Sequence, residues 1–136
     1  MSADQFVSSW AGGDDLISRV AGNCSNTIVV IHSVGPVLIE DYKNNPNVTA
    51  ILWAGIPGEQ SGNSIADVLY GRQNPSAKLP FTMGAKREDW GVDVLYSPNN
   101  GNGAPQQGFS EGIFIDYRGF DQFNTCLLYT SPSPRD

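Results

Sequence analysis

Two runs of apolar residues dominate the hydrophobic pattern of this 136-residue chain. They are Thr27–His32 (TIVVIH) and Asn47–Trp53 (NVTAILW), and neither contains Asp, Glu, Lys or Arg. Short continuous apolar runs that are rich in β-branched residues are typical of strands buried on both faces of a parallel sheet. The sequence therefore predicts two such strands over these residues.

The segments beside these runs carry the start and stop signals of helices. Residues Asp14–Ala21 begin with two acidic side chains, which predicts a short helix. A second short helix is expected over residues 36–44, with Pro36 as its first residue because a missing N–H costs nothing there. A third helix, over residues 61–71, places its apolar residues on one face and ends at a glycine.

The pattern changes in the second half of the chain. Lys78–Thr82 is expected to be a short edge strand, because its proline cannot donate to a central ladder. Ser97–Gln107 is a polar loop rich in Gly, Asn and Pro, and loops of this length usually have a function or wrap a neighbour. Ile113–Tyr117 (IFIDY) alternates like a further strand.

Strands and helices alternate along the first half of the chain, which predicts an α/β fold. We expect a largely parallel sheet flanked by helices, an α/β sandwich. The loops that follow the two apolar runs then leave the same, carboxyl edge of the sheet. Open α/β sheets bind ligands at this edge, so candidate chemistry belongs there.

The charge balance narrows the classes of partner. The formal net charge is −6, which argues against nucleic acid and against an anionic membrane surface. No apolar run approaches the roughly 18 residues of a membrane span. The N-terminal residues lack the basic and apolar regions of a signal peptide. A neutral ligand such as a sugar is compatible with this composition.

Cysteine and histidine are too few for a metal cluster. The chain has two cysteines, Cys24 and Cys126, and one histidine, so neither a metal site nor a cofactor is expected. A native disulfide between the two cysteines is not favoured. Asn23 and Asn47 each begin an N-glycosylation sequon, which matters only if the chain is secreted.

Nucleophilic catalysis and nucleotide binding find little support in the motifs. His32 precedes Ser33 directly, and adjacent strand residues point to opposite faces, so we interpret His32 as a packed, hydrogen-bonded residue at a strand end. No G-x-S-x-G elbow occurs, and the glycines near Gly58 do not have the spacing of a dinucleotide or phosphate loop.

Paired carboxylates are the remaining chemistry, since glycoside hydrolysis requires two of them. Glu59 lies in the loop after the second apolar run and is the natural candidate. The alternative, which we favour, is that Glu59 stabilises the start of the following helix through the macrodipole. Glu111, Asp116 and Arg118 lie around the last predicted strand, where a structural ion pair is favoured over a catalytic role.

Three tryptophans could stack on sugar rings, although a lone tryptophan is more often a core residue. They are Trp10, Trp53 and Trp90.

Several long blocks resemble the second, α/β-sandwich domain of glycoside hydrolase family 3. The blocks are NTIVVIHSVGPVLIEDYKNNPNVTAILWAG, WAGIPGEQSGNSIADVLYGRQNPSAKLPFT and PNNGNGAPQQGFSEGIFIDYRGFD. Fungal β-glucosidases are the most similar members. The resemblance covers about residues 10–124 and implies an α/β sandwich that is incomplete at both ends.

The resemblance also implies where the catalytic groups lie. In the family an aspartate nucleophile comes from a barrel-like first domain, and the acid/base glutamate comes from a loop before a segment whose tryptophan corresponds to Trp10. Neither carboxylate would then be in this chain, which leaves Glu59 as a weak candidate. We therefore expect residues 1–125 to be a partial family 3 domain. Residues 126–136 resemble nothing in the family, and we expect a non-native or disordered tail.

The resemblance implies part of a secreted, retaining β-glucosidase. Such an enzyme hydrolyses terminal non-reducing β-D-glucosyl residues of cellobiose and other β-glucosides, with the barrel domain as intramolecular partner of this one. The isolated chain is expected to be inactive. Two alternatives stay open at this point: a non-catalytic carbohydrate-binding or interaction module, and a family member with another sugar specificity, such as a β-xylosidase.

Overall fold

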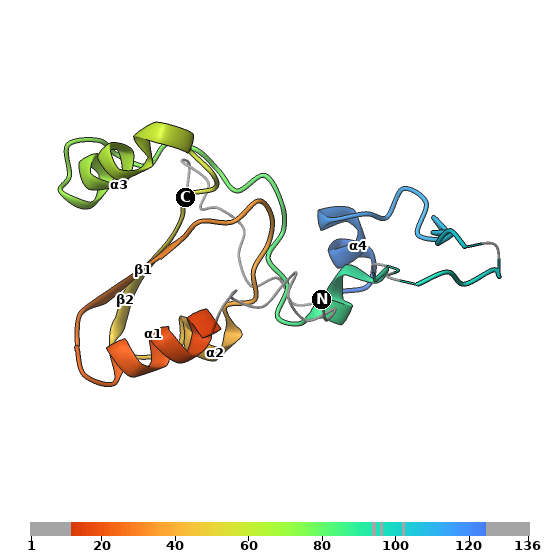
Figure 1. The fold of residues 1–136 in the computed structure, drawn as a ribbon, viewed down its shortest axis with the longest axis horizontal. Coiled ribbons are helices and arrows are strands. Elements are labelled where there is room, and N and C mark those ends of the chain that lie inside the picture. Colours follow the sequence, from red (N-terminus) through yellow and green to blue (C-terminus); the bar gives the residue numbers. More distant parts are fainter. Residues whose placement is uncertain (1–11, 94, 96, 102, 125–136) are drawn as a thin grey trace.

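A computed structural model describes residues 12–93, 95, 97–101 and 103–124. Its regular elements alternate in the first half of the chain and become sparse in the second (Figure 1). In order, they are α1 Gly13–Ala21, β1 Thr27–Ile31, α2 Glu40–Lys43, β2 Val48–Trp53, the 3₁₀ turn η3 Gly58–Gln60, α3 Ser61–Leu69, the 3₁₀ turn η4 Arg87–Trp90 and α4 Tyr117–Gln122.

The two strands form the sheet of the described residues, and they are parallel. Ile28 pairs with Ala50, and Ile31 pairs with Trp53, so both strands end at the same edge. The predicted α/β class, both strands and the helices α1 and α3 are confirmed, with boundaries within about two residues of those expected. The described residues contain no helix that is long and apolar enough to cross a membrane.

The hydrophobic core lies on one face of this sheet, beneath α1 and α2. Its buried residues include Val29, Ile39, Tyr42 and Met83, with Leu79 and Phe81 packed against them. These residues come from a strand, a short helix and the long segment after α3. The core therefore ties residues near position 80 to the first half of the chain.

The prediction that both strands are buried on both faces is wrong for the described residues. Val29 is 7% exposed and points into the core, whereas its neighbour Ile28 is 46% exposed. Successive strand residues point to opposite faces, so Ile28 lies on the second face of the sheet, where it is exposed.

The second predicted helix is much shorter than expected. It begins at Glu40, and Pro36 precedes it in irregular backbone. Val37 and Ile39 are both buried, at 7% and 4% exposure. Val37 and Ile39 can both point into the core only if the chain is extended there. We therefore attribute the start of α2 at Glu40, rather than at Pro36, to the burial of these two side chains.

Neither of the other two predicted strands forms. Lys78–Thr82 joins no ladder, because Leu79 and Phe81 pack on the core and the Thr82 N–H donates to the Asp116 carboxylate at 2.9 Å. Ile113–Tyr117 is a series of turns that leads into α4. The Phe114 N–H donates to the Glu111 carbonyl at 2.9 Å, so local turn bonds replace a ladder there.

The predicted polar loop over Ser97–Gln107 is confirmed where the structure describes it, since helix and strand are both absent from those positions. Trp10, Cys126 and residues 126–136 lie outside the described residues, as do the predictions made for them.

Candidate functional site at the carboxyl edge of the sheet

The carboxyl ends of β1 and β2 meet at one edge, as the sequence predicted. The Ala54 N–H donates to the Ile31 carbonyl at 2.9 Å, which extends the pairing one residue beyond β2. Residues 32–39 and 54–60 then leave the sheet as two loops. These loops hold His32, Ser33 and Glu59, the residues that the sequence offered for chemistry at this edge.

His32 and Ser33 do not form a nucleophile–base pair. The Ser33 hydroxyl donates to the Gly35 carbonyl at 2.9 Å and accepts the Gly35 N–H at 3.3 Å. Its hydrogen bonds therefore shape the loop. His32 is exposed, so the expectation of a packed histidine is wrong, and it takes part in no hydrogen bond or ion pair among the described residues.

Glu59 lies in the middle of η3, one residue before the last residue of that turn, and α3 starts at Ser61. Its side chain is exposed and has no hydrogen-bond or ion-pair partner among the described residues. The position agrees with a helix-start role, where an anion is favoured by the macrodipole. That electrostatic role stays a prediction.

The turn after β2 is shaped by Trp53. The ring of Phe81 meets the Trp53 ring edge-on, with centroids 5.0 Å apart. Gly55 has φ of 64° and lies over the same ring, where an added Cβ would be 3.3 Å from the nearest ring carbon. Only glycine meets both conditions without strain, so the W-A-G sequence encodes a tight turn packed on an aromatic ring. The Trp53 indole N–H is buried and lacks a partner among the described groups.

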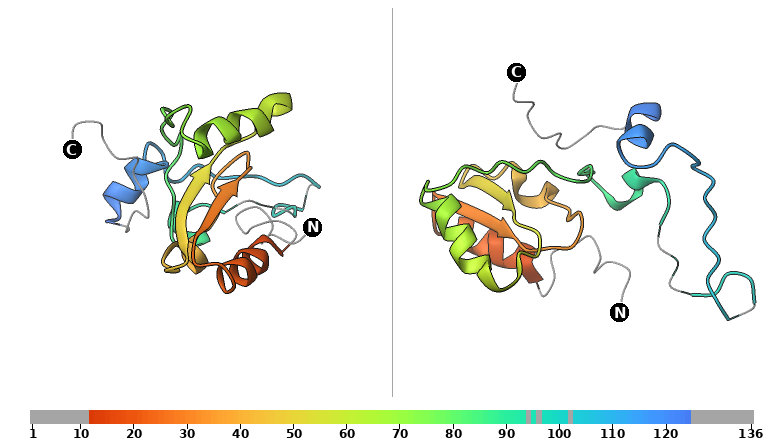
Figure 2. Two further views of the ribbon diagram at one scale, coloured as in Figure 1. Left: turned by 90° about the vertical axis from the view of Figure 1, so that its left-hand side faces the viewer. Right: turned by 90° about the horizontal axis from the view of Figure 1, so that it is seen from above.

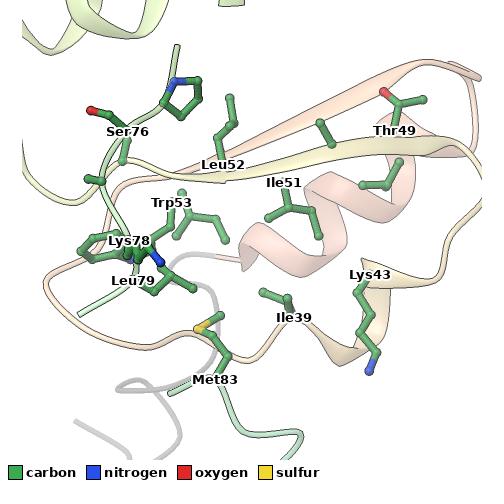
Figure 3. A pocket seen from close by; sticks show the side chains of 16 residues that line it. Ile39, Lys43, Thr49, Ile51, Leu52, Trp53, Ser76, Lys78, Leu79 and Met83 are labelled. Atoms are coloured by element: carbon green, nitrogen blue, oxygen red, sulfur yellow. The ribbon is translucent and has the colours of Figure 1, made fainter. Parts of the chain in front are cut away.

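A groove of about 690 Å³ runs along β2 rather than across its end (Figure 3). One wall is the whole of β2, and the other is the irregular segment Pro75–Leu79. Ile39, Ile51 and Met83 lie at its base, which makes it the open side of the hydrophobic core. The described residues that line it include two lysines but no carboxylate, so they cannot supply glycosidase chemistry.

The other candidate carboxylates lie in a different part of the molecule. Glu111 and Asp116 precede α4, whereas Glu59 precedes α3, and these two helices lie on opposite sides of the molecule in Figure 1. The Arg118 guanidinium donates to the Tyr117 hydroxyl at 3.2 Å and forms no ion pair among the described residues. The structural ion pair predicted there is therefore wrong.

Asp116 has a structural role that the sequence reasoning missed. Its Oδ1 accepts the N–H of buried Thr82, 34 positions earlier in the chain. Its φ of 51° and ψ of −133° lie outside the left-handed helical region, in backbone that residues other than glycine rarely adopt. The sequence offers no signal for a contact between positions so far apart.

The structure also shows the surroundings of Trp90 and Cys24. Trp90 is half-buried and meets the ring of Phe120 edge-on at 6.2 Å, so it packs inside the molecule. Cys24 is a free, exposed thiol. Among the described residues no group of three or more His, Cys, Asp or Glu side chains could hold a metal ion.

The two sequons differ in their surroundings. The Asn23 side-chain amide donates to the Arg19 carbonyl at 2.8 Å on an exposed surface. The Asn47 amide donates to the Ala21 carbonyl at 2.7 Å, and this bond is partly buried between α1 and the start of β2. Glycosylation at either position stays a prediction.

Comparison with known proteins identifies the relatives of this arrangement. The family model for the glycosyl hydrolase family 3 C-terminal domain matches residues 3–117. Beta-glucosidase 1 of Aspergillus aculeatus is 64% identical over 120 residues, which are 88% of this chain and 14% of that protein. The chain therefore spans about one seventh of the length of such relatives.

Solved structures agree with the sequence relatives. A glycoside hydrolase family 3 β-glucosidase from Neurospora crassa superimposes with a TM-score of 0.85 at 61% identity, over 89% of this chain and 14% of that one. Beta-D-glucoside glucohydrolase from Trichoderma reesei superimposes with a TM-score of 0.80 at 40% identity, over 89% and 16%.

Proposed function

The chain belongs to glycoside hydrolase family 3, and from this premise we propose that it is part of a longer β-glucosidase that hydrolyses terminal β-D-glucosyl residues. The observation that carries the proposal is the 64% identity to a β-glucosidase over 120 residues. Within that enzyme the described residues would be scaffold, because their candidate carboxylates are dispersed and the groove along β2 has none.

The proposed reaction is retaining hydrolysis by two carboxyl groups about 5 Å apart. One would attack the anomeric carbon and form a glycosyl-enzyme, while the other would protonate the leaving oxygen and later activate water. We place both groups in parts of the enzyme beyond this chain. The exposed side chain of Glu59, which has no hydrogen-bond or ion-pair partner among the described residues, supports this assignment.

Two assays test the proposal. The purified 136-residue chain should not hydrolyse an aryl β-glucoside. The Aspergillus aculeatus enzyme, with its matching 120 residues replaced by those of this chain, should hydrolyse it. A chimera that folds but shows no turnover, or that prefers an aryl β-xyloside, would overturn the assigned activity.

Glu59→Gln separates a scaffold role from a catalytic one. In the chimera we expect kcat/KM to stay within about twofold, since an exposed residue that starts a helix contributes through local electrostatics only. Asp15→Asn is a matched control, because Asp15 is an exposed acid in the first turn of another helix, α1. A loss of a hundredfold or more for Glu59→Gln alone would return Glu59 to the active site.

Secretion is also part of this proposal. The support is that the relatives are fungal β-glucosidases. Treating secreted chimera with an endoglycosidase and mapping the released peptides would show whether Asn23 or Asn47 carries a glycan.

A further inference from the structure

The turn between α1 and β1 lies at the amino edge of the sheet, which is the edge opposite the candidate functional site. In Figure 2 the two strands run from the α1 side of the molecule toward α3. Gly22 closes α1, with its N–H donating to the Ser18 carbonyl at 2.9 Å, and β1 begins at Thr27. Residues 23–26 between them are all exposed. The turn is therefore a surface feature that regular structure fixes at both ends.

The first three residues of this turn, Asn23, Cys24 and Ser25, form an N-glycosylation sequon. A sequon needs an accessible asparagine amide and a serine or threonine hydroxyl two positions later. Asn23 and Ser25 are both exposed, and Ser25 takes part in no hydrogen bond among the described residues. The motif and its surroundings thus agree at this position.

The Asn23 amide can carry a sugar and keep its own hydrogen bond. Its Nδ2 donates to the Arg19 carbonyl at 2.8 Å, in the last turn of α1. A side-chain amide has two N–H groups, so one hydrogen remains for substitution. Because this bond lies at the exposed surface, a glycan on Asn23 would project into solvent from the C-terminal end of the helix.

The second sequon is built differently, although folding brings it to the same turn. The Asn47 amide donates to the carbonyl of fully buried Ala21, two positions before Asn23. The Thr49 hydroxyl donates to the side-chain oxygen of Asn26 at 2.7 Å. Both polar groups of this sequon therefore join β2 to the end of α1 and its turn, whereas the Asn23 amide bonds only within its own helix.

We propose that Asn23 carries an N-linked glycan at the amino edge of the sheet, and that the Asn47 amide holds the end of α1 on β2. The glycan rests on the proposed function, since only a secreted enzyme meets the glycosylation machinery. In the transfer, the bond from C1 of N-acetylglucosamine to the pyrophosphate of a lipid-linked donor breaks. C1 then bonds to Asn23 Nδ2, and the amide proton goes to the released pyrophosphate. The glycan would lie away from the loops that hold Glu59.

Ser25 provides the sharpest variants, because it completes the sequon and belongs to no described hydrogen bond. The Aspergillus aculeatus chimera described above is secreted from a fungal host in three forms, with Ser25, with Ser25→Ala and with Ser25→Thr. Ser25→Ala should abolish the glycan and Ser25→Thr should keep it, since threonine also completes the sequon. Enzymatic removal of the glycan in isotope-labelled water, followed by peptide mass spectrometry, labels the asparagine that carried it.

The expected result is a label on Asn23 in the Ser25 and Ser25→Thr forms, and its loss in Ser25→Ala. A chimera in which Asn23 stays unlabelled in all three forms would overturn the glycan assignment. A label that persists in Ser25→Ala would overturn it as well, because the amide would then have been hydrolysed without a glycan.

Asn47→Ala tests the contrast between the two sequons. It removes the bond to Ala21, so the α1 amides of the isolated chain, produced in bacteria without glycans, should exchange about fivefold faster. Asn23→Ala is the control, because its bond to Arg19 is exposed and water replaces it, and exchange should change by less than about twofold. Equal acceleration by both variants would contradict the structural role of Asn47.

The chimera also separates this inference from the proposed function. Turnover of an aryl β-glucoside is measured on the same sample that is mapped. An active chimera with an unmodified Asn23 would refute the glycan alone, and a glycosylated but inactive chimera would refute the activity alone. If the chimera is not secreted, only residues 13–31, which form α1, its turn and β1, are exchanged into the Aspergillus aculeatus enzyme, and the same three forms are compared.

Discussion

Similar apolar residues are buried in one region of the molecule and exposed in another. The first region is the α/β unit, residues 12–83, and the second is the segment over residues 97–124, here called the arm. In the unit, Ile39 is 4% exposed and belongs to the core, whereas Ile113 in the arm is 67% exposed. The unit is organised by strand pairing and packing, and the arm by turns and side-chain hydrogen bonds. Apolar character alone therefore does not identify a core residue. What matters is whether the surrounding backbone can close over it.

The largest expected effect tests this contrast directly. Ile39→Ala should lower the free energy of unfolding of the isolated chain by about 3 kcal/mol, because it leaves a cavity in the core. Ile113→Ala should change it by less than about 0.5 kcal/mol. Urea titration followed by tryptophan fluorescence measures both. Equal losses would mean that the arm is part of the folded core.

A smaller effect is expected at the junction of the two regions. Asp116→Ala removes the acceptor of the Thr82 N–H and should destabilise the attachment of α4 by about 2 kcal/mol, since this bond involves a charged group. Asp116→Asn keeps a side-chain oxygen that can accept the Thr82 N–H, so it should lose less. Hydrogen exchange of the α4 amides reports the difference, and we expect about a 30-fold faster exchange for Asp116→Ala.

The β1 and β2 amides serve as the internal reference in that experiment. Their exchange should be unchanged in both Asp116 variants, because the sheet is packed by residues of the unit. If they exchange faster as well, the two regions unfold as one cooperative body.

Gly55→Ala should lower the free energy of unfolding by about 1–2 kcal/mol. The alanine would have an unfavourable positive φ, and its Cβ would press against the Trp53 ring. Gly58→Ala is the matched variant in the same loop, because Gly58 also has a positive φ but has open space around its Cα. The difference between their unfolding free energies isolates the ring contact. A larger loss at Gly58 would contradict the proposed role of Trp53.

The smallest effect is expected at the neck of the arm. Asn99→Ala removes both bonds to Gln106 and should destabilise the loop by about 1 kcal/mol or less, because the site is exposed and water replaces the amide. Global unfolding should not change. Subtilisin cleavage of the isolated chain in this loop should accelerate by up to about fivefold, and an unchanged rate would show that the neck is not what orders the loop.

The sequence predicted the unit better than the arm for a physical reason. Strands such as Thr27–Ile31 are encoded by a continuous local pattern, and so is the amphipathic helix α3. The late start of α2 and the failure of Lys78–Thr82 to form a strand depend on partners far away in the chain, notably Asp116. Alternation in Ile113–Tyr117 suggested a strand, but the turn bonds at Glu111 override it.

For the candidate site too, the predictions that depend on local sequence patterns were right and those that depend on distant contacts were wrong. The sequence located the carboxyl edge and the position of Glu59, because both depend on element order. It predicted a packed His32, which is exposed, and an ion pair at Arg118, which is absent among the described residues. Family membership, which rests on long ordered blocks of sequence, was accessible from the sequence and is confirmed by the family match and by the identity to known β-glucosidases.

The two-stranded parallel sheet has a consequence for handling the isolated chain. Its strands, TIVVI and VTAILW, lack charged residues, and within the described structure neither has a neighbour on its outer edge. Exposed uncharged edges of this kind template the addition of further strands, including those of other chains. Concentrated solutions of the chain should therefore be prone to cross-β fibril growth, with the rate set by how often the unpaired edge of β1 meets another molecule.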